Sequence, residues 1–128
     1  MRWCFEQTAT PYSENVLELL LSGHRAYVPV LWLYEGAAVL AKSRRTGAIS
    51  AEKAHGFLED LRSLDIMVDE EGFARIFGDV HRLAVERRLT AYDAADLELA
   101  IREQLPLASL DDDLNKAALA VGVPLFQA

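Results

Sequence analysis

The sequence has very little cysteine and no long apolar run. Cys4 is the single cysteine among 128 residues, so no internal disulfide can form, which agrees with a reducing compartment. No histidine lies near Cys4, and we interpret it as a packed or idle thiol. The longest apolar runs, 28–33 and 37–41, are far shorter than the roughly 20 residues of a membrane helix. No apolar segment of a secretory signal follows Arg2, so we expect a cytoplasmic protein without a membrane partner.

Basic residues are also in the minority. Lys and Arg number 13 against 20 Asp and Glu, which gives a formal net charge of −7. This balance argues against ordinary electrostatic attraction to nucleic acid. It does not exclude a nucleic-acid enzyme, because carboxylates that gather around divalent cations are neutralised when the metal binds. The length and the 52% of hydrophobic residues predict one domain over residues 1–128 with a packed core.

Several common catalytic and binding motifs are absent. His24, His55 and His81 lie far apart with no Cys or His at ligand spacing, so a zinc site is not expected. There is no glycine-rich phosphate loop and no Gly-x-Ser-x-Gly turn, which excludes P-loop nucleotide binding and serine hydrolase chemistry of that type.

Hydrophobic periodicity predicts alternating helices and short strands. The alternation implies an α/β fold, with parallel strands joined by helical crossovers and a sheet covered by helices on both faces. The helix predicted over 73–86 has the strongest period, with Phe73, Phe77, Val80 and Leu83 on one stripe. The expected strands are 26–31, 66–68, 106–110 and 123–126, and the other expected helices are 13–22, 32–43, 50–61, 90–104 and 114–121.

Acidic residues follow three of the predicted strands, where ligands gather in α/β folds. Glu35 follows the first strand, 69–71 the second and 111–113 the third. Glu35 is expected in the first turn of its helix among apolar residues. It is either a functional carboxylate or an acid favoured by the helix dipole.

Asp93 and the acidic run 111–113 each have a structural and a functional interpretation. Asp93 fits a capping box that opens at Thr90, yet it also heads a stripe with Leu97, where an uncompensated acid costs free energy. One carboxylate of 111–113 is expected to cap the following helix, but three are more than a cap requires. The spacing of an EF-hand loop is missing.

Four stretches together resemble a PIN domain of the VapC toxin type: Trp-Cys-Phe-Glu at 3–6, Val-Pro-Val-Leu-Trp-Leu-Tyr-Glu at 28–35, Leu-Thr-Ala-Tyr-Asp-Ala-Ala-Asp-Leu-Glu-Leu-Ala at 89–100 and Leu-Pro-Leu-Ala-Ser-Leu-Asp-Asp-Asp-Leu at 105–114. The resemblance covers nearly the whole chain. It implies a metal-dependent endoribonuclease of a toxin-antitoxin system, which cleaves RNA with metal-activated water, forms a homodimer and binds a VapB-like antitoxin.

The resemblance also implies a set of site residues. Glu35, Asp93 and Asp111 match three of the four carboxylates of the family, with Asp113 as an accessory ligand, and Ser109 matches a small hydroxyl residue that orients the site. These oxygen ligands would hold Mg²⁺ or Mn²⁺. RNA contacts at the rim are expected from Lys42, Arg44, Arg45, Arg87 and Arg88, which have the alternative interpretation of ordinary helix-end charges.

The sequence departs from the family at its start. The first acid of the family lies on an opening strand upstream of the Trp-Cys-Phe-Glu stretch, whereas here Met1 and Arg2 directly precede Trp3. We therefore expect that strand and its aspartate to be absent. In the family it lies between the strand before Glu35 and the strand before Asp111, so we expect the exposed edges of these two strands to pair with each other or with a partner chain. Three readings follow: a ribonuclease impaired by the loss of one acid, a catalytically degenerate PIN-like domain that acts as a protein-interaction module, and a non-nuclease α/β domain.

Overall fold

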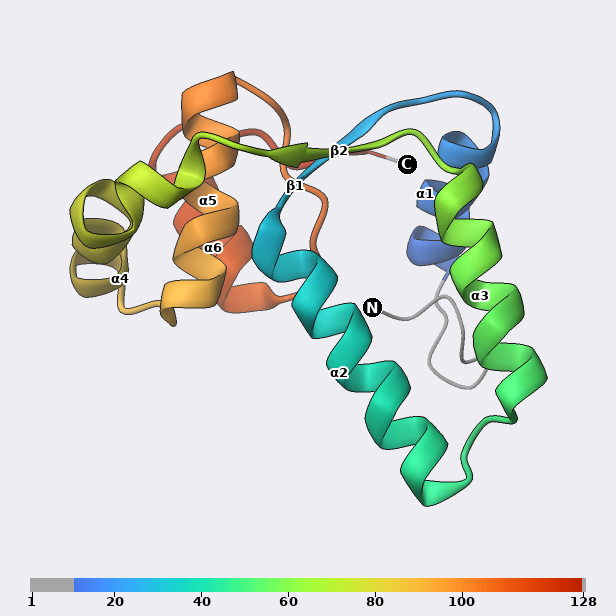
Figure 1. Cartoon of the computed structure of the whole chain (residues 1–128). Coiled ribbons are helices and arrows are strands. Elements are labelled where there is room, and N and C mark those ends of the chain that lie inside the picture. Colours follow the sequence, from blue (N-terminus) through green and yellow to red (C-terminus); the bar gives the residue numbers. More distant parts are fainter. Residues whose placement is uncertain (1–10, 128) are drawn as a thin grey trace. The chain divides into compact units, whose positions relative to one another are not determined.

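The structure, a computed structural model, describes residues 11–127 and confirms the α/β class (Figure 1). The motif at 3–6 lies outside the described residues. Strands β1 and β2 pair in a two-stranded parallel sheet. The elements are α1 (Pro11–Leu21), β1 (Ala26–Pro29), α2 (Val30–Thr46), α3 (Ala51–Ser63), β2 (Ile66–Asp69), the 3₁₀ helix η2 (Gly72–Arg75), the π-helix η3 (Ile76–Val80), α4 (His81–Arg87), α5 (Ala91–Glu103) and α6 (Asp112–Ala120).

The chain divides into two compact units, of which the first ends at Met67. Its helices end and begin at residues suited to those positions. Gly23 follows α1 with a φ of 102°, a conformation that glycine adopts without strain, and Ser50 caps α3 by accepting a hydrogen bond from the Lys53 amide at 3.1 Å. A small core of Leu40, Ile49 and Ala54 joins α2 to α3.

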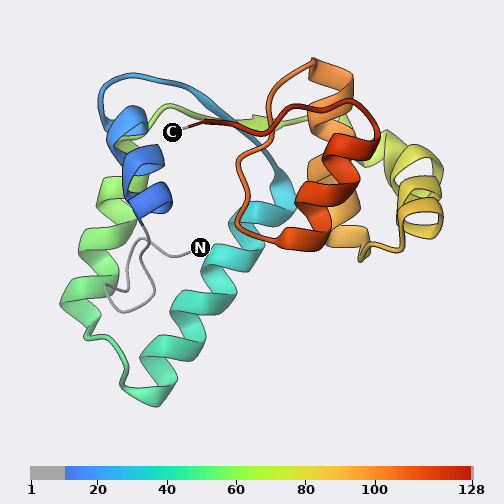
Figure 2. The same ribbon diagram turned by 180° about the vertical axis from the view of Figure 1, so that it is seen from behind.

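The second unit, Val68–Gln127, is built around α5. This helix contacts α4 and α6, and Figure 2 shows α5 and α6 side by side from behind. Leu97 and Ala94 of α5 are completely buried. The cluster around them comprises Val80, Leu83, Ala100, Leu107, Leu114, Ala117, Ala118 and Val123.

The last two predicted strands are shorter in the structure than expected. They reduce to a parallel bridge between Leu107 and Leu125, in which the Leu107 amide donates to Pro124 O at 2.9 Å and the Phe126 amide donates to Leu107 O at 2.8 Å. Because Pro124 has no amide hydrogen, it cannot extend this ladder as a donor.

The single regular helix predicted over 73–86 is wrong. The segment is a succession of 3₁₀ helix, π-helix and α-helix, and only its second half has the expected buried face. Val80 and Leu83 are buried, whereas Phe73 and Phe77 are 88% and 96% exposed. A π-turn contains more residues per turn than an α-helix, so residues before it lose their phase with residues after it.

A search of the helices within residues 11–127 found none with the length and apolar character to cross a membrane.

Candidate functional site

Asp93 stands at the start of α5, where the local sequence fixes it. Thr90 is the N-cap, and its Oγ1 accepts a hydrogen bond from the Asp93 amide at 3.1 Å, as the capping pattern predicts. One and two turns further along the helix, Leu97 and Ala100 are buried. The half-buried Asp93 therefore heads the buried stripe of α5, as expected from the sequence.

Asp93 lies within electrostatic reach of two other carboxylates. Burial raises the pKa of Asp93, and the negative charges of Asp111 and then Asp113 raise it further, against the hydrogen bond with the Thr90 side chain, which lowers it. The structure thus brings Asp93, Asp111 and Asp113 close enough for their charges to interact. A cation bound among them would relieve this repulsion.

Asp111 is the N-cap of α6 and is held by its neighbours. Its Oδ1 accepts a hydrogen bond from the Leu114 amide at 2.8 Å, and its own amide donates to Ser109 Oγ at 3.0 Å. Asn115 Nδ2 donates to Ser109 O at 3.0 Å, which fixes the turn before the helix. Asn115 Oδ1 is buried without a hydrogen-bond partner among the described residues.

The donor chemistry of this cluster suits a hard divalent cation. Carboxylate oxygens are among the ligands that Mg²⁺ and Mn²⁺ prefer, and Asp93, Asp111 and Asp113 supply them. Within residues 11–127, no group of three or more His, Cys, Asp and Glu side chains is arranged to hold an ion. The chemistry of the acidic cluster therefore fits the metal, although the side chains do not form a complete coordination shell.

Glu35 lies in the first unit, on the exposed surface of α2. Because α2 begins at Val30, its first turn contains no acid, and the expected first-turn position of Glu35 is wrong. The helix-dipole explanation for Glu35 is lost with that position, since the effect is confined to the first turn. Its role as a ligand stays a prediction.

The expected RNA-binding residues of α2 are accessible. Lys42, Arg44 and Arg45 are exposed, and the two arginines lie in the last turn before Gly47 ends the helix. None of the three forms an ion pair with a residue in the part of the chain that the structure describes. Their guanidinium and ammonium groups are therefore open to a polyanion, or serve as helix-end charges as the alternative holds.

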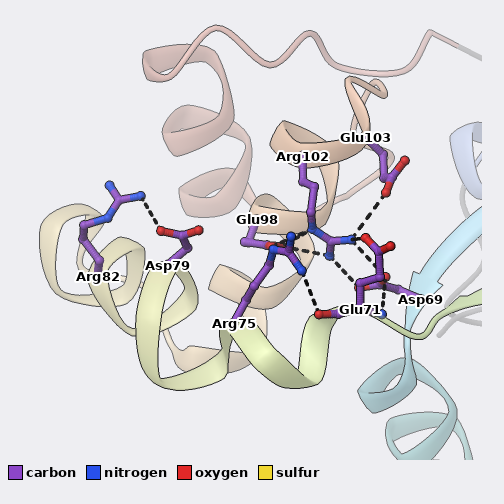
Figure 3. Close-up of polar contacts among 8 residues, drawn as sticks. All are labelled: Asp69, Glu71, Arg75, Asp79, Arg82, Glu98, Arg102 and Glu103. Carbon is purple, nitrogen blue, oxygen red and sulfur yellow. Dashed lines mark hydrogen bonds and ion pairs between the residues drawn. The ribbon is translucent and has the colours of Figure 1, made fainter.

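A buried ionic cluster around Arg102 escaped sequence reasoning (Figure 3). Arg102 Nη2 and Nη1 donate to the two carboxylate oxygens of Asp69 at 2.6 and 3.0 Å, and Nε donates to Glu98 Oε1 at 2.8 Å. The Asp69 and Glu98 side chains are 2% and 5% exposed. The Arg102 hydrogen bonds hold the pKa of Asp69 below its usual range, although burial opposes them. The sequence indicates only the Glu98–Arg102 pair of this cluster, because residues four positions apart on a helix lie close enough to form an ion pair.

An open groove of about 260 Å³ lies beside this cluster. Its charged side chains already pair with one another: Arg75 Nε lies 3.5 Å from Glu98 Oε1, and Arg82 Nη2 lies 3.2 Å from Asp79 Oδ1. The groove therefore has a structural explanation that needs no ligand. It is lined by Arg75, Asp79, Arg82, Leu83, Glu98, Ile101 and Arg102.

Comparison with known proteins identifies one family. A family model described as PIN domain matches residues 5–119. A search of curated proteins found no significant match.

Proposed function

The chain belongs to the PIN domain family, and we propose that it is a metal-dependent endoribonuclease of the VapC toxin type. PIN domains are in general metal-dependent nucleases. The observation that carries the proposal is the position of the half-buried Asp93 at the start of α5, within electrostatic reach of Asp111 and Asp113 at the start of α6. A carboxylate whose ionisation is opposed by its neighbours is suited to bind a cation.

In this proposal Asp93 and Asp111 hold the metal, with Glu35 as the third ligand and Asp113 as an accessory. Bound Mg²⁺ or Mn²⁺ would supply an activated water and stabilise the charge on the phosphate. Asp111 uses Oδ1 to cap α6, which orients the carboxylate and leaves Oδ2 for the site. Ser109 acts as a positioning residue, because its hydroxyl accepts the Asp111 amide hydrogen bond.

The partners follow from the same proposal. RNA is the substrate, with contacts from Lys42, Arg44 and Arg45, and residues 1–128 act as a single PIN-like domain. A VapB-like antitoxin and a second copy of the chain are its protein partners, and the cytoplasm is where it meets them.

The decisive experiment compares RNA cleavage by the natural chain and by Asp93→Ala in Mg²⁺ or Mn²⁺. We expect loss of cleavage by a factor on the order of 100 or more for the variant, since a metal ligand is removed. Asp60→Ala, which removes a carboxylate exposed on α3, is the matched control and should cleave at the natural rate. Equal rates for Asp93→Ala and the natural chain would rule out the proposed site.

One observation favours the alternative of a catalytically degenerate PIN-like interaction module. Within residues 11–127 no group of three metal-ligating side chains is arranged for an ion. The two functions differ in metal dependence. A ribonuclease should melt at a higher temperature when Mn²⁺ is added, because a ligand of the native state stabilises it, whereas a degenerate module should melt at the same temperature.

A further inference from the structure

Exposed aromatic, apolar and cationic residues follow the helical segment from η2 to α4 in the second unit. His81, Val85 and Arg88 follow one another at spacings of four and three residues along one face of α4 and its C-cap, and Phe77 precedes them in η3. Phe77 and Val85 are 96% and 65% exposed. Phe73, 88% exposed, precedes them in η2. We call these five residues the aromatic stripe.

The π-helix explains why the two phenylalanines are exposed. In one continuous α-helix, Phe73 and Phe77 would share a face with the buried Val80. The π-turn over Ile76–Val80 changes the phase, so Val80 and Leu83 enter the core while both rings face solvent. Such turns occur frequently at functional sites. Phe73 and Phe77 lie at such a turn with their rings exposed, so they are candidates for contact with a ligand.

The charge of this segment differs from that of the chain. Residues 73–88 contain four arginines and two acidic residues, within a chain whose net charge is −7. Both acidic side chains, Asp79 and Glu86, pair with Arg82 at 3.2 and 3.4 Å. Arg87 and Arg88 are exposed and form no ion pair with any of residues 11–127. The segment thus presents uncompensated positive charge next to exposed aromatic rings.

The stripe also leads to the acidic cluster. Arg88 is the C-cap that follows α4, and two residues later Thr90 caps α5 and accepts a hydrogen bond from the Asp93 amide. Arg88 and Asp93 are five positions apart in the sequence, so their Cα atoms lie at most about 18 Å apart. A ligand that follows the stripe beyond Arg88 therefore comes within reach of Asp93.

We propose that the aromatic stripe, together with the adjacent Arg87, binds single-stranded RNA, with unpaired bases stacked on Phe73 and Phe77 and phosphates contacted by Arg87 and Arg88. The inference rests on the proposed function and adds a surface outside the acidic cluster that binds its RNA substrate. Stacking on aromatic rings combined with cationic contacts is the usual mode of single-strand binding. The exposed large apolar side chains of η2 and η3 are Phe73, Ile76 and Phe77, and the charges of Arg87 and Arg88 on the same segment, unpaired within residues 11–127, favour a polyanion over an apolar protein surface.

The test measures RNA binding separately from cleavage. Fluorescence anisotropy of a labelled single-stranded RNA of roughly 12 nucleotides, recorded in EDTA, reports affinity while metal-dependent cleavage is suppressed. We expect Phe73→Leu/Phe77→Leu to weaken binding by about 10-fold or more, because leucine keeps apolar surface but cannot stack. Phe73→Trp/Phe77→Trp should bind as tightly as the natural chain or more tightly. Leu119→Ala, at an apolar residue 60% exposed on α6, is the matched control and should leave the affinity unchanged.

Two outcomes would overturn the proposal. One is unchanged RNA affinity in the leucine variant. The other is a change of oligomeric state in Phe73→Ala/Phe77→Ala by light scattering with RNA affinity retained, which would assign the stripe to a protein contact. The proposed function fails separately, since it fails if Asp93→Ala cleaves RNA at the natural rate, whatever the stripe variants bind.

Discussion

Asp93 combines partial burial with two negative neighbours, and this combination has a measurable effect on stability. Its folded-state pKa is raised first by burial and then by the charges of Asp111 and Asp113. The folded chain therefore holds the Asp93 proton more tightly than the unfolded chain does. The free energy of unfolding consequently falls as pH rises from the unfolded pKa through the folded pKa.

We predict that Asp93→Asn unfolds at higher urea concentration than the natural chain at pH 7 without metal. At a pH below the unfolded Asp93 pKa of 3.8, the two chains should differ much less, because the natural side chain is then neutral as well. Urea unfolding followed by circular dichroism across this range checks the prediction. A stability difference that does not change with pH would contradict it.

Arg102 illustrates the opposite case, in which opposite charges compensate burial. We predict that Arg102→Met lowers the free energy of unfolding by about 3–5 kcal/mol, because Asp69 and Glu98 would stay buried without their cation. Arg82→Met breaks only exposed pairs and should cost about 1 kcal/mol or less. Urea denaturation of both variants measures the two values, and equal losses would refute a special role for the buried cluster.

The contribution of Asp69 to the free energy of unfolding depends on pH. The pKa of Asp69 is lowered, chiefly by the hydrogen bonds from Arg102, so its ionised form stabilises the fold at pH values above the unfolded pKa of 3.8. We expect the stability advantage of the natural chain over Asp69→Asn to be complete above that pH and to decline as pH falls through the lower, folded value. Acid titration of the unfolding midpoint checks this expectation, and an advantage that persists in stronger acid would contradict it.

At the scale of elements, Gly72 connects the end of β2 to the Arg102 cluster. A Cβ atom at Gly72 would lie 2.7 Å from Asp69 Oδ2, a carboxylate that Arg102 holds in place. We predict that Gly72→Ala destabilises the protein by about 1–3 kcal/mol through this overlap. Gly56→Ala in α3 has nothing within 4 Å of the added Cβ and should be neutral or stabilise by up to about 1 kcal/mol. Thermal unfolding distinguishes them, and equal melting temperatures would contradict the prediction.

Elements whose limits are set by neighbouring residues were predictable from the sequence. The caps at Ser50 and Thr90 bind amides only three residues away, so α3 and α5 begin where the pattern indicates. The same local logic located Asp93 and Asp111 at the start of helices.

Features that depend on distant residues were not predictable in this way. Asp69 and Arg102 are 33 residues apart in the sequence, and no local pattern joins them. Counting apolar residues at α-helical spacing also cannot detect the phase change at η3, because the count assumes one helical repeat throughout the segment. The Asp69–Arg102 ion pair and the exposed rings beside η3 are therefore seen in the structure and not in the sequence pattern.

At the scale of the molecule, the two units differ in how much apolar surface holds them. The cluster of the second unit joins α4, α5 and α6, whereas the described cluster of the first unit consists of Leu40, Ile49 and Ala54 with Phe57 packed against it. Local stability follows the number of buried apolar contacts. We predict slower hydrogen exchange for the backbone amides of α5 than for those of α3, measured by mass spectrometry on peptides from each helix. Equal protection of both helices would contradict this expectation.

The π-turn of η3 has a consequence for how the length of the segment Ile76–Val80 can change. A π-turn closes its hydrogen bond over five residues instead of four, so it accommodates one additional residue without breaking the helix. Loss of Gly78 would restore the α-helical repeat and place Phe77 two positions before Val80, on nearly the opposite side of the helix. Phe77 would then stay away from the buried Val80, so this segment can shorten by one residue without burying the ring.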